Sequence, residues 1–280
     1  MQSIIKGVFS LLYPSYCYVC GVYLPPLPPA ALCPACYQRV RFINPPYCPR
    51  CGRPFLAGSA EEPSHLCELC MGKPPPFSSA RALAEYGAEV GALIHQFKYG
   101  KKRHLGFLLA GLAARHKRLL RELTPVDAII PVPLHPRRRR ERGFNQAEAF
   151  ARSFARYVNA PVVADQLRKV KNTPPQTGLS RVERLKNVRG AFRLGSRWHY
   201  ARHHLRSAYY ALRHSARHGR FSRAGKRGRK PEPPVALRGK RVLLVDDVYT
   251  TGATVSECSR ELRRGGVKEV KVLTLARVVD

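Results

Sequence analysis

Two adjacent carboxylates follow an apolar run in the segment RVLLVDDVYTTGAT, which spans residues 241–254. Residues 242–245 are aliphatic, as expected of a central strand buried on both faces, and Asp246 and Asp247 stand where that run ends. Carboxylates accept hydrogen bonds from sugar hydroxyls and stabilise a developing cation. The TTGAT loop at 250–254 offers hydroxyls and backbone N–H groups ahead of a predicted helix, an arrangement that binds anions. The segment therefore predicts a sugar-phosphate site, with a plain strand-to-helix turn capped by an aspartate as the alternative.

Paired cysteines dominate the first part of the sequence. Eight of the nine cysteines precede residue 71 and form four C-x-x-C pairs. Two thiolates at this spacing bind one side of a tetrahedral ion, and a second pair completes the shell without leaving a position for water. The pattern predicts two structural Zn²⁺ sites, although the spacing leaves sequential and crosswise combinations open and a disulfide framework is the alternative. The predicted ligands are Cys17, Cys20, Cys33, Cys36, Cys48, Cys51, Cys67 and Cys70.

A second polar segment follows another apolar stretch, VDAIIPVPLHP at 126–136. Here a basic loop, RRRRERG at 137–143, leads into a predicted helix whose first turn holds Asn145 and Gln146. Ligands of parallel α/β sheets bind beyond the carboxyl ends of the strands. Both polar loops follow strands, so we expect them to face one crevice. For the arginines, a solvated loop or a nucleic-acid contact is the alternative.

These segments must be positioned by an α/β framework. Strands and helices alternate from residue 78 onward, which predicts a mostly parallel sheet flanked by helices. The cysteine pairs and a short leading helix form a separate expected domain at 1–77, and the proline run at 73–77 resembles a linker. We therefore expect a small zinc-binding domain followed by an α/β domain at 78–280, interrupted by a basic insertion at about 196–234.

The charge of the chain is strongly positive, with 50 Lys and Arg against 18 Asp and Glu and a formal net charge of +32. Such an excess favours a polyanionic partner or substrate. No apolar run approaches the roughly 20 residues that a membrane span needs. We expect no transmembrane segment and a cytoplasmic location.

The insertion at 196–234 carries 11 basic residues and one acidic residue. Its periodicity predicts a basic amphipathic helix. Basic side chains neutralise phosphates and aromatic rings stack on bases, so single-stranded nucleic acid is a candidate partner. A solvated cationic face and an anionic membrane surface are the alternatives. The candidate nucleic-acid contacts are Trp198, Arg202, Arg206, Arg213 and Arg217.

The segment VLLVDDVYTTGAT resembles the 5-phosphoribosyl-diphosphate (PRPP) signature of type I phosphoribosyltransferases. Together with VDAIIPVPLHPRRRRERGFNQAEAFARSFA, LRKVKNTPPQTGLSRVERLKNVRGAF and the C-x-x-C pairs, it is similar to the ComF/GntX family over nearly the whole chain except about 196–234. The resemblance implies a type I phosphoribosyltransferase-like fold behind a zinc-binding segment. It also implies a role in taking up and handling single-stranded DNA during natural transformation, with proteins of the competence machinery as partners.

The resemblance also implies roles for individual residues. Asp246 and Asp247 would contact the ribose hydroxyls, as the catalytic pair, and Mg²⁺ would accompany the diphosphate, held mainly by the substrate. The segment 168–176 would close over the site. The remaining implied PRPP contacts are Thr250, Thr251, Gly252, Ala253 and Thr254 for the 5-phosphate and Arg142, Asn145 and Gln146 for the diphosphate.

Three functions remain open on the sequence alone. The protein could be an active phosphoribosyltransferase that moves phosphoribosyl from PRPP to an unidentified acceptor. It could instead keep the fold as a binding module whose PRPP pocket regulates DNA handling by a partner. A non-catalytic zinc-ribbon adaptor that binds DNA is the third possibility.

Overall fold

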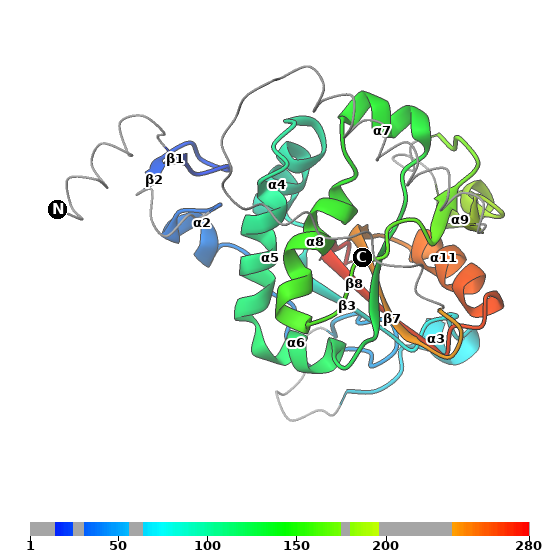
Figure 1. The fold of residues 1–280 in the computed structure, drawn as a ribbon. Helices are drawn as coiled ribbons and strands as arrows, with labels where there is room; N and C mark the ends of the chain where they lie inside the picture. The colour runs from blue at the N-terminus through cyan, green and yellow to red at the C-terminus, as the bar shows by residue number, and fades with distance from the viewer. Residues whose placement is uncertain (1–14, 25–30, 56–63, 175–179, 196–236, 280) are drawn as a thin grey trace, which may run out of the picture.

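A parallel β-sheet forms the centre of the molecule in the computed structural model, which describes residues 15–24, 31–55, 64–174, 180–195 and 237–279. The sheet has four strands in the order β3-β8-β7-β4, and every neighbouring pair is parallel (Figure 1). The expected mostly parallel sheet is thus confirmed. The strands are β3 Ser79–Glu85, β4 Ala128–Pro131, β7 Arg241–Tyr249 and β8 Glu269–Arg277.

Helices cover both faces of this sheet, and the alternation of side chains along β7 explains why. Leu243 and Val245 pack into one apolar core, whereas Val242 and Leu244 pack into the other. The first core includes α4 (Ala88–Tyr99), α5 (Leu105–Arg115) and α8 (Gln146–Val158). The second core includes α11 (Ala253–Arg264), where Cys258 is fully buried. Smaller elements complete the domain: α6 Lys117–Leu123, α7 Pro136–Arg142, β5 Leu167–Lys169, α9 Arg181–Val188 and β6 Phe192–Leu194.

The cysteine-rich part packs against the edge of the sheet. Its elements are β1 Ser15–Tyr16, β2 Tyr23–Leu24, α2 Pro34–Gln38 and α3 Glu68–Gly72. Between the two cysteine groups, the Ile43 N–H donates to the Leu83 carbonyl at 3.1 Å, and the Glu85 N–H donates to the Arg41 carbonyl at 2.9 Å. These bonds cover the outer edge of β3, which would otherwise present unpaired backbone groups.

Two elements differ from the sequence-based expectation. Residues 137–142, expected as a loop, belong to helix α7, which starts at Pro136 and has the His135 side chain accepting from the Arg137 N–H at 3.4 Å. Proline is well suited to a first helical turn because the N–H that it lacks has no intrahelical partner there. β7 continues to Tyr249, so the two acids lie within the strand and not after it. In the described part of the chain, no helix has the length and apolar character to cross a membrane.

Candidate functional site

The two adjacent acids lie near the carboxyl end of β7 and face different surroundings. Successive side chains of a strand point to opposite faces, and the Asp247 side chain is directed toward α4 and α8. There its Oδ2 atom accepts from Gln146 Nε2 at 2.7 Å and lies 3.0 Å from Lys98 Nζ. Asp246 accepts the Asp247 backbone N–H at 2.9 Å. No ion pair with Asp246 occurs among the described residues.

Within the described part of the chain, Asp246 lacks the cationic partner that Asp247 has, and its pKa is shifted. Burial raises the pKa of Asp246 from 3.8 to about 7, and the neighbouring Asp247 carboxylate adds to the rise. The positive charges of Lys98 and Lys169 act in the opposite direction and are smaller effects. At neutral pH the Asp246 carboxyl group is therefore close to half-protonated. A bound cation or a hydroxyl donor would favour its ionised form.

A tight turn connects the acids to helix α11. Gly252 is the residue before the helix and has φ of +74°, a left-handed conformation that favours glycine. A Cβ atom at this position would lie 2.3 Å from Tyr249 Oη, so the turn also requires the absence of a side chain. Backbone N–H groups at the start of α11 lack helical acceptors, and the helix dipole adds partial positive charge. Both features suit the turn to an anion.

Cationic side chains approach the acids from other elements. The Arg138 Nη2 atom donates to the Thr173 carbonyl at 3.3 Å, and Arg142 stacks over the Tyr99 ring at 5.1 Å. Burial lowers the pKa of Lys169, and the charge of Arg138 lowers it further. Protonated Lys169 and Arg138 therefore repel each other, and a bound anion between such groups would relieve the repulsion.

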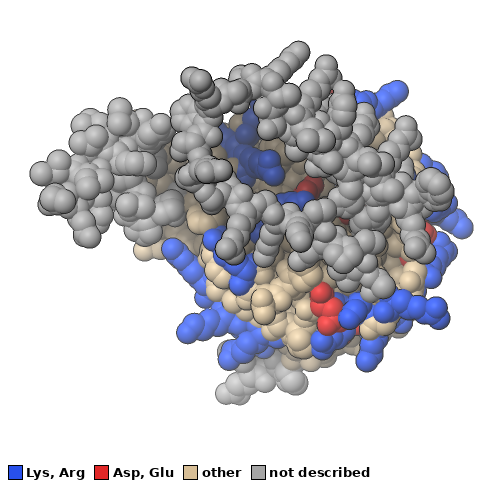
Figure 2. Space-filling view, viewed as in Figure 1, with Lys and Arg blue, Asp and Glu red and all other residues tan. Residues whose placement is uncertain are grey.

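These groups line one cavity of about 510 Å³. Its wall includes both acids, the turn and five basic residues. Figure 2 shows Lys and Arg side chains gathered in a hollow on this face, with a small acidic group beside them. The lining includes Asp246, Asp247, Thr250, Gly252, Ala253, Thr254 and Gln146, together with Lys98, Arg138, Arg142, Lys169 and Arg184.

Two of the expected PRPP contacts do not line this cavity. Asn145 is the N-cap of α8: its Oδ1 accepts from the Ala147 N–H at 3.1 Å, and its Nδ2 donates to the Val132 carbonyl at 3.0 Å. Its side chain therefore ties the start of the helix to the residue that follows β4. Thr251 stands beside the cavity, where its hydroxyl is buried without a hydrogen-bond partner in the described part of the chain. The expected nucleic-acid residues Trp198, Arg202, Arg206, Arg213 and Arg217 lie outside the described residues.

Some residues of the cavity had little or no signal in the sequence. Lys98 belongs to the amphipathic helix α4, and only the packing of that helix on the sheet brings its amine to Asp247. Tyr86 and Tyr99 also line the cavity, and their side chains are largely exposed. Arg138 stands in a run of four arginines, where the helical register of α7 decides which one faces inward.

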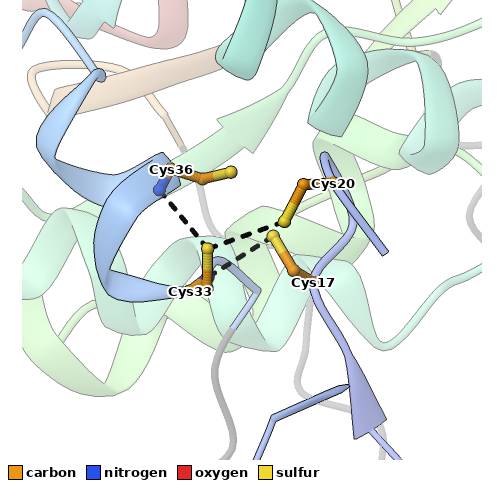
Figure 3. A group of neighbouring side chains, drawn as sticks. All are labelled: Cys17, Cys20, Cys33 and Cys36. Carbon is orange, nitrogen blue, oxygen red and sulfur yellow. Dashed lines mark hydrogen bonds between the residues drawn. The ribbon is translucent and has the colours of Figure 1, made fainter. Parts of the chain in front are cut away.

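The cysteines form two separate groups, and the pairs combine sequentially. Cys17, Cys20, Cys33 and Cys36 make the first group (Figure 3), and Cys48, Cys51, Cys67 and Cys70 make the second. The four sulfur atoms of each group lie within 4.8 Å of one another. The Cys20–Cys33 and Cys51–Cys67 sulfur distances are both 3.7 Å, and a zinc tetrahedron with bonds of about 2.3 Å has edges of about 3.8 Å.

Both cysteine groups therefore fit Zn²⁺ in size and ligand type. Their surroundings support this, because backbone N–H groups approach the sulfurs: the Cys33 N–H lies 3.4 Å from Cys17 Sγ, and the Cys51 N–H lies 3.5 Å from Cys48 Sγ. Such bonds stabilise thiolates over thiols. The cysteine arrangement indicates two structural zinc ions.

Comparison with known proteins agrees with this organisation. The family model of the double zinc ribbon domain matches residues 8–75, and that of the phosphoribosyl transferase domain matches residues 211–279. The DNA utilization protein YhgH of Salmonella typhimurium is 29% identical over 272 residues, which cover 96% of this chain and 100% of that protein.

Competence protein F of Haemophilus influenzae is 30% identical over 249 residues, covering 88% of this chain and 90% of that protein. Among solved structures, the glutamine PRPP amidotransferase of B. subtilis is 17% identical and matches 64% of this chain and 30% of its own, with a TM-score of 0.32. The identity and coverage shared with competence protein F, and the two domain matches, place this chain in the ComF family of double-zinc-ribbon proteins with a phosphoribosyltransferase domain.

Proposed function

We propose that the protein binds PRPP with Mg²⁺ in the cavity at the end of β7, and that this binding serves the uptake or handling of single-stranded DNA. The composition of the cavity wall is the observation that supports PRPP binding. Asp246 and Asp247 stand next to a glycine turn at a helix N-terminus, and five basic side chains surround them. A sugar that carries both a phosphate and a diphosphate matches this mixture of acids, anion-binding turn and cations.

Each part of PRPP has a suitable partner in this arrangement. The 5-phosphate would lie in the turn at 250–254, where Thr250 and Thr254 line the cavity beside the backbone N–H groups that begin α11. The ribose hydroxyls would donate to Asp246 and Asp247. The diphosphate would lie near Arg138 and Lys169, whose mutual repulsion an anion reduces. Mg²⁺ would accompany the diphosphate, held mainly by the substrate, and would offset part of its charge.

The same groups support phosphoribosyl transfer. In that reaction the bond between C1 of ribose and the diphosphate oxygen breaks, and its electron pair leaves with the diphosphate. A nucleophilic atom of the acceptor forms the new bond to C1 and gives up its proton. Carboxylates near the ring would stabilise the cationic ribose, and cations would stabilise the leaving group. Transfer to an acceptor is therefore the second candidate function, with a PRPP-sensing module as its non-catalytic counterpart.

The second half of the proposal draws on the relatives and on charge. Two relatives are named a DNA utilization protein and competence protein F. The formal net charge of +32 suits a nucleic-acid partner. We place the main DNA contacts in the insertion at 196–234 and in the zinc-binding part, since Asp246 and Asp247 would repel phosphates.

Isothermal calorimetry with PRPP and Mg²⁺ tests the PRPP site. The wild type should give a saturable heat, and the Asp246→Asn, Asp247→Asn double variant should lose most of it. Asp127→Asn is a matched control, because Asp127 pairs with Arg241 at 3.1 Å at the opposite end of β7. Equal heats from the wild type and the double variant would refute the site assignment. Release of diphosphate with a candidate acceptor would separate an enzyme from a sensor.

A further inference from the structure

A buried arginine joins the second zinc-binding group to the central sheet. Arg277 is the last residue of β8 and is 7% exposed. Its Nη1 donates to the Cys51 carbonyl at 2.7 Å, and its Nη2 lies 3.8 Å from Cys51 Sγ. Its position is fixed by the sheet, where Arg277 is the register partner of Tyr249.

Burying a guanidinium is strongly unfavourable without a compensating negative charge. In the described part of the chain, Arg277 makes no ion pair with a carboxylate. A Zn²⁺ ion held by four thiolates carries net negative charge, and a guanidinium stays cationic at any ordinary pH. With Zn²⁺ bound, the four thiolates of the second group, Cys48, Cys51, Cys67 and Cys70, would supply the countercharge that Arg277 otherwise lacks.

The other side of Arg277 faces the candidate PRPP site. Its Cζ lies 4.3 Å from the centre of the Tyr249 ring. Tyr249 is 7% exposed and lines the cavity, and its hydroxyl occupies the space where a Cβ of Gly252 would stand, 2.3 Å away. A continuous set of contacts therefore runs from a zinc ligand, Cys51, through Arg277 and Tyr249 to the turn before α11.

We propose that Arg277 and Tyr249 are positioning residues that couple the second zinc centre to the phosphate-binding turn. With zinc bound, the charged thiolates hold Arg277, Arg277 holds the Tyr249 ring, and the ring supports the left-handed turn at Gly252. Without zinc, the backbone around Cys51 is no longer held by the metal, so Arg277 loses a fixed acceptor in the Cys51 carbonyl and the support under the turn weakens. This inference rests on the proposed PRPP site.

Such a link has a thermodynamic consequence. If zinc at the second centre strengthens PRPP binding, PRPP must strengthen zinc binding by the same factor. Contacts behind metal ligands typically change metal affinity by about 10- to 100-fold. We expect saturating PRPP and Mg²⁺ to raise the affinity of one of the two zinc ions, measured by competition with a chelator, and to leave the other unchanged.

Arg277→Lys tests the arginine, because it keeps the charge and loses the planar fork. Arg39→Lys is the matched control: the Arg39 Nη2 donates to Cys36 Sγ at 3.1 Å in the first zinc-binding group, on a largely exposed side chain. We expect Arg277→Lys to weaken binding of one zinc and of PRPP about tenfold each. Arg39→Lys should leave PRPP affinity unchanged. Native mass spectrometry counts the zinc, and calorimetry measures PRPP.

Hydrogen exchange on the wild type tests the coupling without any variant. Removing the zinc of the second cysteine group with a chelator should speed amide exchange at 250–254, compared with the protein that holds both zinc ions. A normal PRPP affinity in Arg277→Lys despite loss of its second zinc would overturn the coupling. The coupling would also be refuted if the wild type binds PRPP and its zinc affinity does not change when PRPP is added. Unchanged amide exchange at 250–254 after zinc removal would refute it as well. Absence of any PRPP heat in the wild type would refute the proposed function instead, and the exchange arm would still test the link.

Discussion

The substitution Asp246→Asn should stabilise the folded protein, and more so as the pH rises. Asp247 has Lys98 and Gln146 as partners, whereas Asp246 has its neighbour's backbone N–H. An asparagine keeps the Oδ1 acceptor for that N–H and removes the charge that burial opposes. The variant should therefore lose no hydrogen bond and relieve an electrostatic cost.

The size of the effect follows from the pKa. Burial raises the pKa of Asp246 from 3.8 to about 7, and each pH unit corresponds to about 1.4 kcal/mol. A raised carboxyl pKa leaves stability intact below pH 3.8 and removes it progressively as the pH rises toward about 7. The full cost at pH 8.5 is about 4 kcal/mol, or about 2 kcal/mol if water screens the partly exposed side chain.

Urea unfolding of zinc-saturated protein at pH 5 and pH 8.5 provides the assay. The gain in unfolding free energy from Asp246→Asn should grow by about 3 kcal/mol between the two pH values, or by about 1 kcal/mol if water screens the side chain. Asp247→Asn should instead destabilise by about 1–3 kcal/mol, since Lys98 and Gln146 lose a buried acceptor. An equal gain at both pH values, or a less stable Asp246→Asn at pH 8.5, would refute this account of the acid pair.

The remaining predictions concern metal, DNA and the turn. Elemental analysis of reduced protein should find two zinc ions per chain, one for each cysteine group, and Cys48→Ser should lower the count to one; a zinc-free preparation would contradict this. Single-stranded DNA affinity measured by fluorescence anisotropy should fall with salt at a log–log slope of about −3.5 if about five phosphates are neutralised. Deleting 197–233 should flatten that slope while PRPP binding stays nearly intact, and an unchanged slope would rule out the insertion as the DNA contact. Gly252→Ala should abolish the calorimetric PRPP heat, since its Cβ would lie 2.3 Å from Tyr249 Oη at a φ of +74°; a normal heat would show that the turn tolerates a side chain.

Much of the fold could be predicted because its signals are local. The aliphatic run at 242–245 identifies a buried strand, and four C-x-x-C pairs identify two tetrahedral sites. The combination of those pairs could not be predicted, because spacing permits both arrangements and the path of the chain between residues 36 and 48 decides. The proline at 136 and the arginines after it also allow a loop or a short helix, and the structure has the helix α7.

The site was harder to predict in full because its partners come from distant elements. The Lys98–Asp247 contact depends on how α4 packs against β7, which no local pattern encodes. Asn145, expected as a ligand contact, is a helix cap instead. A polar residue at the start of a helix is as well suited to capping as to ligand binding. The Asn145 side chain accepts from the Ala147 N–H and donates to the Val132 carbonyl, so both of its hydrogen bonds are structural. Residue type alone does not separate these roles.

The strand order β3-β8-β7-β4 constrains how the protein is made. β8 is the last of these strands to leave the ribosome, yet it lies between β3 and β7, so β3 has no strand partner in the sheet until residues 269–277 have emerged. The cysteine groups are synthesised long before and can bind metal first. The segment at 41–43 then covers β3 along one edge while the opposite edge stays open. During translation, an exposed strand edge of this kind is a site for chaperone binding and for mispairing with other nascent chains.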